Sequence, residues 1–482
     1  MTTTSDRKGR IKEDRKDENK KEQTDNNYNN NSNDKDINVQ HSDKKVSSAK
    51  LLPPSSFHKT ILGKLGPGII TGSSDADPSG IATYAQAGAQ FGFGMAWLVL
   101  FLYPMMTAVQ EMCARIGLVT GSGLAAIIKQ KYSRKIIFPL TSLLLIANTI
   151  NIGTDIGAMG ASIRLVFPQL PVIVATLSFT IFIILSEVFV PYNKYVKILK
   201  YLILSLFAYL ATVIIVGGNW NQIFTAVLIP HIEFTPAFAM MFVAIVGTTI
   251  SPYLFFWQAS EEAEEDIAKH KIKEIGKDIP KISKKEIRSM REDTAIGMAF
   301  SQIIMWAIMI TTAVSLHTHG ITDIQTADQV AKALEPLVKT FPQAGEISKT
   351  IFALGIIGTG LLAIPVLAGS SGYALSDVLG WREGLSKQFK QAKGFYLVIA
   401  ASTLIGLWIN FINIDPIRAL VYTAVINGVI AVPILFAVMK VANDKKLLKD
   451  NTNSRMSNVI GWLTFVMMGV SSIIMFVTWG KQ

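Results

Sequence analysis

The stretch Thr71-Gly-Ser-Ser-Asp-Ala-Asp-Pro-Ser-Gly80 lies inside an apolar segment, at about residues 62–88, that is long enough to cross a bilayer. It places two carboxylates, Asp75 and Asp77, where hydrocarbon would surround them. An ionised carboxylate at that depth costs several kcal/mol unless it is paired or hydrated. Such residues inside a spanning segment therefore indicate a functional site rather than a lipid-facing helix.

The same stretch carries residues that interrupt a helix. Pro78 has no backbone N–H to donate, and Gly72 and Gly80 tolerate turns that other residues avoid. We predict that the helix unwinds around Asp77. The alternative is a continuous helix that Pro78 kinks, in which Asp77 has a purely structural role.

The composition indicates a membrane protein. Of 482 residues, 50% are hydrophobic and 17% are charged, and the mean hydropathy is +0.36 although residues 1–60 are almost entirely polar. This balance excludes an ordinary soluble enzyme. The single cysteine, Cys113, excludes a disulfide framework and cysteine-based zinc or iron–sulfur sites.

Eleven apolar segments follow a polar N-terminal region, and each approaches the roughly 20 residues that a membrane crossing needs. They span about 62–88, 93–114, 136–164, 170–190, 195–217, 236–260, 293–316, 348–376, 394–412, 416–439 and 457–479. The predicted fold is an all-α polytopic membrane protein with eleven transmembrane helices in a domain over residues 57–482. Residues 1–56 combine an Asn-rich run with mixed charge and are predicted to be a disordered cytoplasmic tail.

Lysine and arginine are distributed unequally between the connections. With a cytoplasmic N-terminus, the inner connections hold 26 of these residues, and the outer connections hold Arg164, Lys332, Lys339 and Lys349. The positive-inside rule then predicts a cell-membrane protein whose C-terminus is external. The pI of about 9.4 is explained without a nucleic-acid partner.

The sixth segment repeats the interruption of the first. Val246-Gly-Thr-Thr-Ile-Ser-Pro-Tyr253 brings Gly247 and Pro252 into a span and adds three hydroxyl side chains. Two interrupted helices, five helices apart, are the pattern of two inverted five-helix repeats with a binding site between the breaks. The repeats are expected at about residues 62–217 and 236–439, followed by an extra helix.

The helix dipoles at these breaks favour a cation. The first half of each interrupted helix ends at mid-membrane, so carbonyl groups and the negative end of each dipole face the gap beside Asp77. Carboxylate, hydroxyl and carbonyl oxygens are hard ligands that suit Mg2+, Ca2+ or Mn2+.

Three motifs carry a resemblance to a known family. Asp77-Pro-Ser-Gly-Ile-Ala-Thr83 resembles the Asp-Pro-Gly-Asn motif of the NRAMP divalent-metal transporters. Gln110-Glu-Met-Cys-Ala-Arg-Ile-Gly-Leu-Val-Thr-Gly121 resembles their signature at the end of helix 2, and Thr154-Asp155 resembles their acidic stretch in helix 3. The resemblance covers all eleven segments but not the tail. It implies a LeuT-type fold and inward metal transport through a transmembrane transporter domain.

The resemblance also assigns candidate metal ligands. Asp77 corresponds to the first ligand and the carbonyl of Thr248 to a second. Ser251 falls at the position of the family's methionine ligand and Gly80 at that of its asparagine, as in the NRAMP-related magnesium transporter branch that the chain resembles. Without the thioether, selectivity for soft transition metals is expected to weaken. The smaller residues also predict a larger cavity that admits a partly hydrated ion.

Groups that relay protons in the resembled family are largely absent. Tyr253 and Gln258 replace its two helix 6 histidines, and Ala158 replaces a helix 3 glutamate. Candidate residues of the ion pathway are Asp75, Asp155, Tyr253 and Asn427. For Asp155 and Asn427 the alternative role is hydrogen bonding between helices.

Taken together, these features predict a secondary transporter that imports Mg2+, Mn2+ or both by alternating access, with weak or no proton coupling. Two alternatives stay open: a proton-coupled Mn2+/Fe2+ transporter of the NRAMP type, and a sodium-coupled amino-acid symporter of the same architecture. The symporter would need donors for a carboxylate, whereas this site presents mainly acceptors. Neither an enzyme nor a bound cofactor is expected. A monomer suffices, and the oligomeric state stays open.

A run of five carboxylates closes the sixth segment, formed by Glu261, Glu262, Glu264, Glu265 and Asp266. Acidic groups at a helix C-terminus oppose its dipole, so they do not stabilise the helix. They are interpreted as a solvated connector that the following lysines balance. The alternative is a cation-attracting exit.

Overall fold

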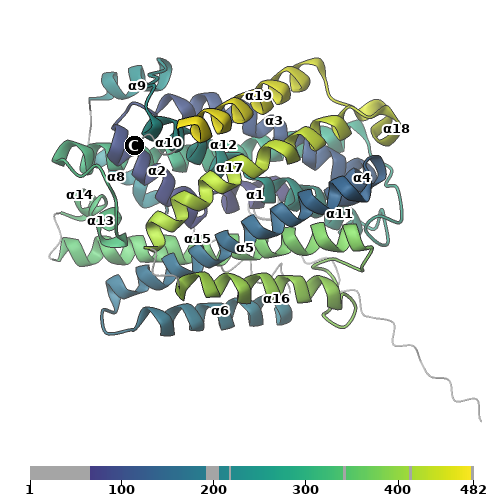
Figure 1. Ribbon diagram of the computed structural model, residues 1–482, viewed down its shortest axis with the longest axis horizontal. Helices are drawn as coiled ribbons and strands as arrows, with labels where there is room; N and C mark the ends of the chain where they lie inside the picture. The colour runs from purple at the N-terminus through teal and green to yellow at the C-terminus, as the bar shows by residue number, and fades with distance from the viewer. Residues whose placement is uncertain (1–65, 191–205, 217–218, 340–342, 412–414, 479–482) are drawn as a thin grey trace, which may run out of the picture. The chain divides into compact units, whose positions relative to one another are not determined.

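The structure is a computed structural model that describes residues 66–190, 206–216, 219–339, 343–411 and 415–478 (Figure 1). The predicted tail, residues 1–56, lies outside these ranges. Every regular element in the described residues is a helix, which confirms the all-α class. Nine helical spans among them are long and apolar enough to cross a membrane.

Two further predicted crossings are divided or partly described. The first is divided between α1 (Pro67–Asp75) and α2 (Pro78–Phe91), so neither half spans a bilayer alone. The fifth is described only in α8 (Phe207–Val216), because residues 191–205 lie outside the described ranges. Together with the nine longer spans, these account for the eleven predicted segments.

Both helix interruptions lie where the polar residues predicted them. α1 ends before Asp77, which is the N-cap of α2. The sixth crossing likewise consists of α10 (Pro236–Thr249) and α11 (Pro252–Ala268), with Ser251 at the N-cap position of α11. Each second half begins with proline, whose missing N–H has no partner to lose at the first helical position.

The helices form two packed groups. The broken helices pack against α3, α12 and α17, whereas α5, α15, α6 and α16 pack together (Figure 1). The bounds of these seven are α3 (Trp97–Thr120), α5 (Arg134–Val166), α6 (Val172–Phe189), α12 (Lys284–Ser315), α15 (Ala344–Leu379), α16 (Lys393–Leu407) and α17 (Pro416–Ala442). In the second group, α5 and α6 are the third and fourth helices of the first predicted repeat, and α15 and α16 are those of the second. This is the LeuT-type inverted repeat that the sequence predicted.

Glycines near the breaks allow close packing, and the prediction that Gly72 helps the helix to unwind is wrong. Gly72 lies within α1, and an ideal Cβ on it would be 2.1 Å from the carbonyl oxygen of Gly297 in α12. Gly247 lies within α10, where an ideal Cβ would be 2.1 Å from the carbonyl oxygen of Ala424 in α17. Backbones this close leave no room for a side chain, so these glycines set how tightly the half-helices pack.

Short helices and one last crossing complete the described residues. They are α4 (Leu124–Lys131), α9 (Trp220–Leu228), η5 (His317–His319), α13 (Ala327–Lys332), α14 (Glu335–Val338), η6 (Trp408–Phe411), α18 (Lys445–Leu448), η7 (Lys449–Asn451) and α19 (Arg455–Thr478). Large apolar side chains stay exposed along α6 and α19, among them Phe182, Leu463 and Val466. Surfaces of this kind suit the hydrocarbon of a bilayer.

Candidate functional site

The Asp77 carboxylate is the centre of the polar contacts at the first break. Its Oδ1 accepts a hydrogen bond from the backbone N–H of Gly80 at 2.6 Å. Its Oδ2 accepts from Asn151 Nδ2 of α5 at 3.2 Å and from the Tyr253 hydroxyl of α11 at 3.4 Å. Asp77 is 2% exposed, and no cationic side chain of the described residues pairs with it. The carboxylate therefore joins three helices and has a charge that a cation would neutralise.

The second break offers the two oxygen groups predicted there, but they bond to each other. The Ser251 hydroxyl donates to the carbonyl oxygen of Thr248 at 2.8 Å and to that of Gly247 at 2.9 Å. Both Thr248 and Ser251 are buried. An ion bound by the Thr248 carbonyl and the Ser251 hydroxyl would therefore replace a hydrogen bond that already exists.

The space beside Gly80 is filled by a side chain from another helix. An ideal Cβ on Gly80 would lie 2.5 Å from the Cε methyl of Met305, which belongs to α12 and is buried. The larger cavity expected at Gly80 is therefore wrong for this conformation. Sequence reasoning missed Met305 because no motif on its own helix signals the contact.

Asn151 contacts Asp77 directly, although it was not among the predicted pathway residues. It precedes Asp155 by four positions in α5, and this spacing puts both on one helix face. That spacing is the signal by which the sequence could have revealed it. Asp155 itself is fully buried, and neither of its carboxylate oxygens has a hydrogen-bond partner in the described residues.

Tyr253 and Asn427 are two of the remaining pathway candidates. The Tyr253 hydroxyl is also 3.3 Å from the carbonyl oxygen of Ser74, at the end of α1. On α17, the Thr423 hydroxyl lies 3.3 Å from that of Thr154 in α5. Asn427, four positions further along α17, is buried, and its Oδ1 has no hydrogen-bond partner in the described part of the chain.

Asp75 is directed to a different helix from Asp77. Its Oδ2 accepts a hydrogen bond from the Ser301 hydroxyl of α12. Asp77 is bonded instead to groups of α5 and α11. The two carboxylates of the first break thus make hydrogen bonds to different sets of helices.

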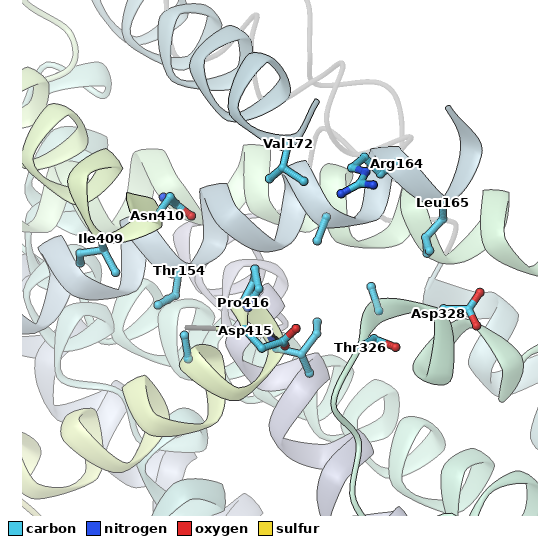
Figure 2. A pocket seen from close by; sticks show the side chains of 14 residues that line it. Thr154, Arg164, Leu165, Val172, Thr326, Asp328, Ile409, Asn410, Asp415 and Pro416 are labelled. Atoms are coloured by element: carbon cyan, nitrogen blue, oxygen red, sulfur yellow. Dashed lines mark hydrogen bonds between the residues drawn. The ribbon is translucent and has the colours of Figure 1, made fainter. Parts of the chain in front are cut away.

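A cavity of about 450 Å³ lies where α5 ends and α17 begins (Figure 2). Its lining includes the charged residues Arg164, Asp328 and Asp415. The lining also includes Thr154, the residue that precedes Asp155. The cavity therefore extends toward the first break from this end of the helix bundle.

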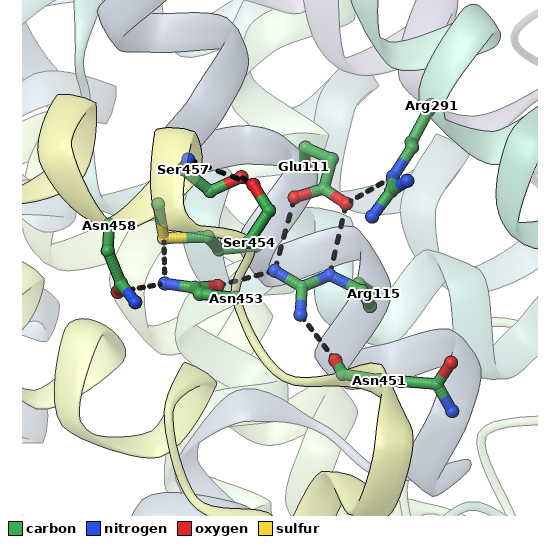
Figure 3. Close-up of polar contacts among 9 residues, drawn as sticks. Glu111, Arg115, Arg291, Asn451, Asn453, Ser454, Ser457 and Asn458 are labelled. Carbon is green, nitrogen blue, oxygen red and sulfur yellow. Dashed lines mark hydrogen bonds and ion pairs between the residues drawn. The ribbon is translucent and has the colours of Figure 1, made fainter.

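A buried polar network lies at the other end of the bundle, where α3 ends (Figure 3). Arg115 donates to the Glu111 carboxylate through Nε at 3.0 Å and through Nη2 at 3.2 Å. It also donates to Asn453 Oδ1 at 2.5 Å and to the carbonyl oxygen of Asn451. Arg291 of α12 reaches the same carboxylate at 2.8 Å. The network ties α3 and α12 to the connection that precedes α19.

The acidic run after the second break lies inside α11 and not in a solvated connector, but the following lysines do balance part of it, since Lys269 pairs with Glu265 and Lys271 with Asp266, each at 3.0 Å. Glu261 and Glu262 are both buried. Gln258 Nε2 donates to Glu262 at 3.0 Å, and the hydroxyl of Tyr373 in α15 donates to Glu264 at 2.9 Å. Neighbouring side-chain donors therefore bond Glu262 and Glu264.

The ligand types at the breaks suit an ion that passes through. Nowhere in the described residues do three His, Cys, Asp or Glu side chains gather as a resident metal site would require. Asp77 instead accepts hydrogen bonds from the Gly80 N–H, the Asn151 amide and the Tyr253 hydroxyl. A single carboxylate with neutral oxygens can bind a hard cation and still release it.

Two inverted repeats, each with a broken helix, and a buried carboxylate between the breaks define a secondary transporter. A family model described as natural resistance-associated macrophage protein-like, Nramp, matches residues 68–478. The chain belongs to this family, which is a family of transporters and not of enzymes. It is a multi-pass membrane protein that transports divalent metal ions.

Solved structures share the fold. The crystal structure of the Eremococcus coleocola manganese transporter in complex with an aromatic bis-isothiourea substituted compound has a TM-score of 0.70 and 18% identity, covering 88% of this chain and 87% of that chain. A mutant of the same transporter has a TM-score of 0.69 with the same identity and coverage. A nucleobase-cation-symport-1 family transporter, in a closed conformation with bromovinylhydantoin bound, has a TM-score of 0.51 and 11% identity, covering 86% and 94%.

Proposed function

We propose that the chain imports Mg2+ and Mn2+ across the cell membrane by alternating access, with weak or no coupling to protons. The observation that carries this proposal is the buried Asp77 carboxylate, which lacks a cationic partner in the described residues and is surrounded by neutral polar groups. The C-termini of α1 and α10 end at the same gap and favour a cation. Similarity to a manganese transporter supports Mn2+ as one of the ions.

Each site residue has a role in this proposal. Asp77 is the anionic ligand, and the Thr248 carbonyl and the Ser251 hydroxyl are neutral ligands. Gly80 would let the ion approach the helix backbone once the Met305 methyl moves away from it. The residues that line the path on either side are Asp75, Asp155, Tyr253 and Asn427. This ligand set contains oxygen and no sulfur, and it therefore favours Mg2+ and Mn2+ over soft ions.

The positive-inside rule supports the direction of transport. It places the N-terminus in the cytoplasm and the C-terminus outside, so the cavity between α5 and α17 is the external entrance. A divalent ion moving inward gains roughly 4.6 kcal/mol per 100 mV, twice the value for one charge. The membrane potential alone can therefore drive uptake.

Uptake by the purified full-length protein in liposomes tests this function. Wild type should accumulate both Mg2+ and Mn2+, and Asp77→Ala should nearly abolish accumulation because the anionic ligand is lost. Asp323→Ala, in an exposed connection, is the matched control and should transport like wild type. Uptake by Asp77→Ala at the wild-type rate, or no uptake of either ion by wild type, contradicts the proposal.

One observation favours a second function, proton-coupled transport of Mn2+ or Fe2+. Asp155 is buried four positions from Asn151, and both of its carboxylate oxygens lack partners in the described residues. A carboxyl group placed in this way can gain and lose a proton near the metal site. The two functions differ in whether protons accompany the metal.

A further inference from the structure

A second polar cluster lies at the breaks, on the side that faces α12. Asp75 is the last residue of α1 and Thr249 is the last residue of α10. Each stands three positions before the proline that begins the following half-helix, so the inverted repeat places them at equivalent positions. Two helix C-termini therefore end in this cluster, and their dipoles favour a cation.

Side-chain oxygens from four helices contribute to the cluster. The Ser301 hydroxyl of α12 donates to Asp75 Oδ2, and the Tyr84 hydroxyl of α2 is 2.7 Å from Thr249 Oγ1. Asp75 and Gln302, the neighbour of Ser301, both lie close enough to act on the Tyr84 hydroxyl. The five residues are at most 3% exposed. The cluster is therefore sealed from bulk water in this conformation.

Two oxygens of the cluster lack partners. Neither Asp75 Oδ1 nor Gln302 Oε1 has a hydrogen-bond partner in the described residues. No Lys, Arg or His within the described ranges acts on Asp75. A buried carboxylate and a buried amide oxygen that lack partners are both costly, and one bound cation would satisfy both. Because the other groups are neutral, one monovalent ion would neutralise the cluster.

We propose that Asp75, Ser301 and Gln302 form a second cation site that binds Na+, with the Tyr84 and Thr249 hydroxyls beside it. Na+ is a small, hard ion that takes carboxylate, amide and hydroxyl oxygens, as the coupling ions of broken-helix transporters do. The site is separate from that of the divalent ion, because the partners of Asp77 lie on α5 and α11. The inference does not depend on which divalent ion is carried.

Equilibrium binding of radiolabelled Na+ to the purified full chain, without divalent ions, tests the proposal. Wild type should bind Na+ saturably, and Asp75→Asn, which keeps the shape and removes the charge, should lower the affinity by about tenfold or more. Ser301→Ala should weaken binding to a smaller extent. Ser472→Ala is the matched control, since its buried hydroxyl bonds within α19 at 2.8 Å, and it should bind like wild type.

Asp77→Ala separates this site from the proposed transport site. It should keep Na+ binding although it loses divalent-ion uptake. Three results would overturn the proposal: no saturable Na+ binding by wild type, unchanged affinity in Asp75→Asn, or loss of Na+ binding in Asp77→Ala while Asp75→Asn retains it. The last result would place Na+ at Asp77 instead.

Discussion

At the scale of single residues, the Ser251 hydroxyl stands where the resembled family has a thioether. Ser251→Met would bring sulfur next to the Thr248 carbonyl. We expect this variant to raise the apparent affinity for Cd2+ and to slow Mg2+ uptake, because soft ions prefer sulfur and hard ions prefer oxygen. Inhibition of Mn2+ uptake by increasing Cd2+ in liposomes measures the change.

Ser251→Ala is the control for this prediction. It removes the hydroxyl, which donates at 2.8 Å to Thr248, without adding sulfur. Cd2+ affinity that is equal in Ser251→Met and wild type would argue against Ser251 as a ligand. A wild type that carries Fe2+ or Mn2+ but excludes Mg2+ would show that the magnesium-branch resemblance is misleading.

The contact between Gly80 and Met305 predicts a compensating pair of substitutions. Gly80→Asn would place atoms 2.5 Å from the Met305 methyl, and overpacking of this kind costs about 1–3 kcal/mol. Met305→Ala alone leaves a cavity and costs about 2–5 kcal/mol. The double variant should lose less stability than the two single losses added together, because asparagine occupies space that methionine vacates.

Thermal unfolding of the four proteins in detergent completes this double-mutant cycle. Additive losses would mean that the two positions do not share the space. Restored stability without restored Mg2+ uptake would assign Met305 a part in ion selection as well as in packing.

At the scale of elements, the network around Glu111 joins α3 to α12. The Arg115 side chain is 1% exposed, whereas that of Arg291 is 50% exposed. Glu111→Gln should lower stability by roughly 3–5 kcal/mol, because it leaves the buried Arg115 charge without an anionic partner. Arg291→Gln should cost about 0–1 kcal/mol, since its pair with Glu111 is screened by water.

Apparent melting temperatures of the detergent-solubilised variants test this order. Glu111→Gln should melt well below Arg291→Gln. Equal melting temperatures would mean that the buried ion pair contributes no more to stability than the exposed one.

The breaks themselves could be predicted from sequence, but the details of their packing could not. Asp77 and Ser251 each precede a proline, and a polar N-cap before proline is a local signal for a helix start. The role of Gly72 could not be predicted in this way, because glycine occurs both in turns and where helices pack closely. The choice depends on Gly297 of α12, which is distant in sequence.

At the scale of the whole molecule, segment length and hydropathy were sufficient to predict the crossings, and the two helix interruptions were sufficient to predict the inverted repeat. The carboxylate, hydroxyl and carbonyl groups at the breaks could also be named. Which of these groups lie on the same side of the gap could not be predicted, because that depends on how α5, α11 and α12 surround it. Asp75 and Asp77 illustrate this. They are two positions apart in the chain, yet Asp75 bonds to Ser301 of α12 and Asp77 bonds to Asn151 of α5.

Proton coupling is a property of the whole transport cycle. We expect Mg2+ or Mn2+ uptake into liposomes to leave the pH of the lumen unchanged. Of the proton relay in the resembled family, this chain keeps only Asp155, and a single carboxylate does not form a relay across the membrane. A pH-sensitive dye in the lumen measures this during uptake driven by a membrane potential. Asp155→Asn should then transport at a rate near that of wild type.

Acidification of the lumen in proportion to metal uptake would contradict this expectation. If Asp155→Asn abolished that acidification, the proton-coupled function would be favoured and Asp155 would be its proton carrier.

The hydrogen bond from the Ser251 hydroxyl to the Thr248 carbonyl bears on how readily an ion escapes. An arriving ion must displace this bond, whose net worth is about 1 kcal/mol, and a departing ion allows it to form again. The exchange lowers the affinity for the ion in the conformation described here. A carrier benefits from such weakening, because residence at the midpoint of the membrane must be brief for turnover to be fast.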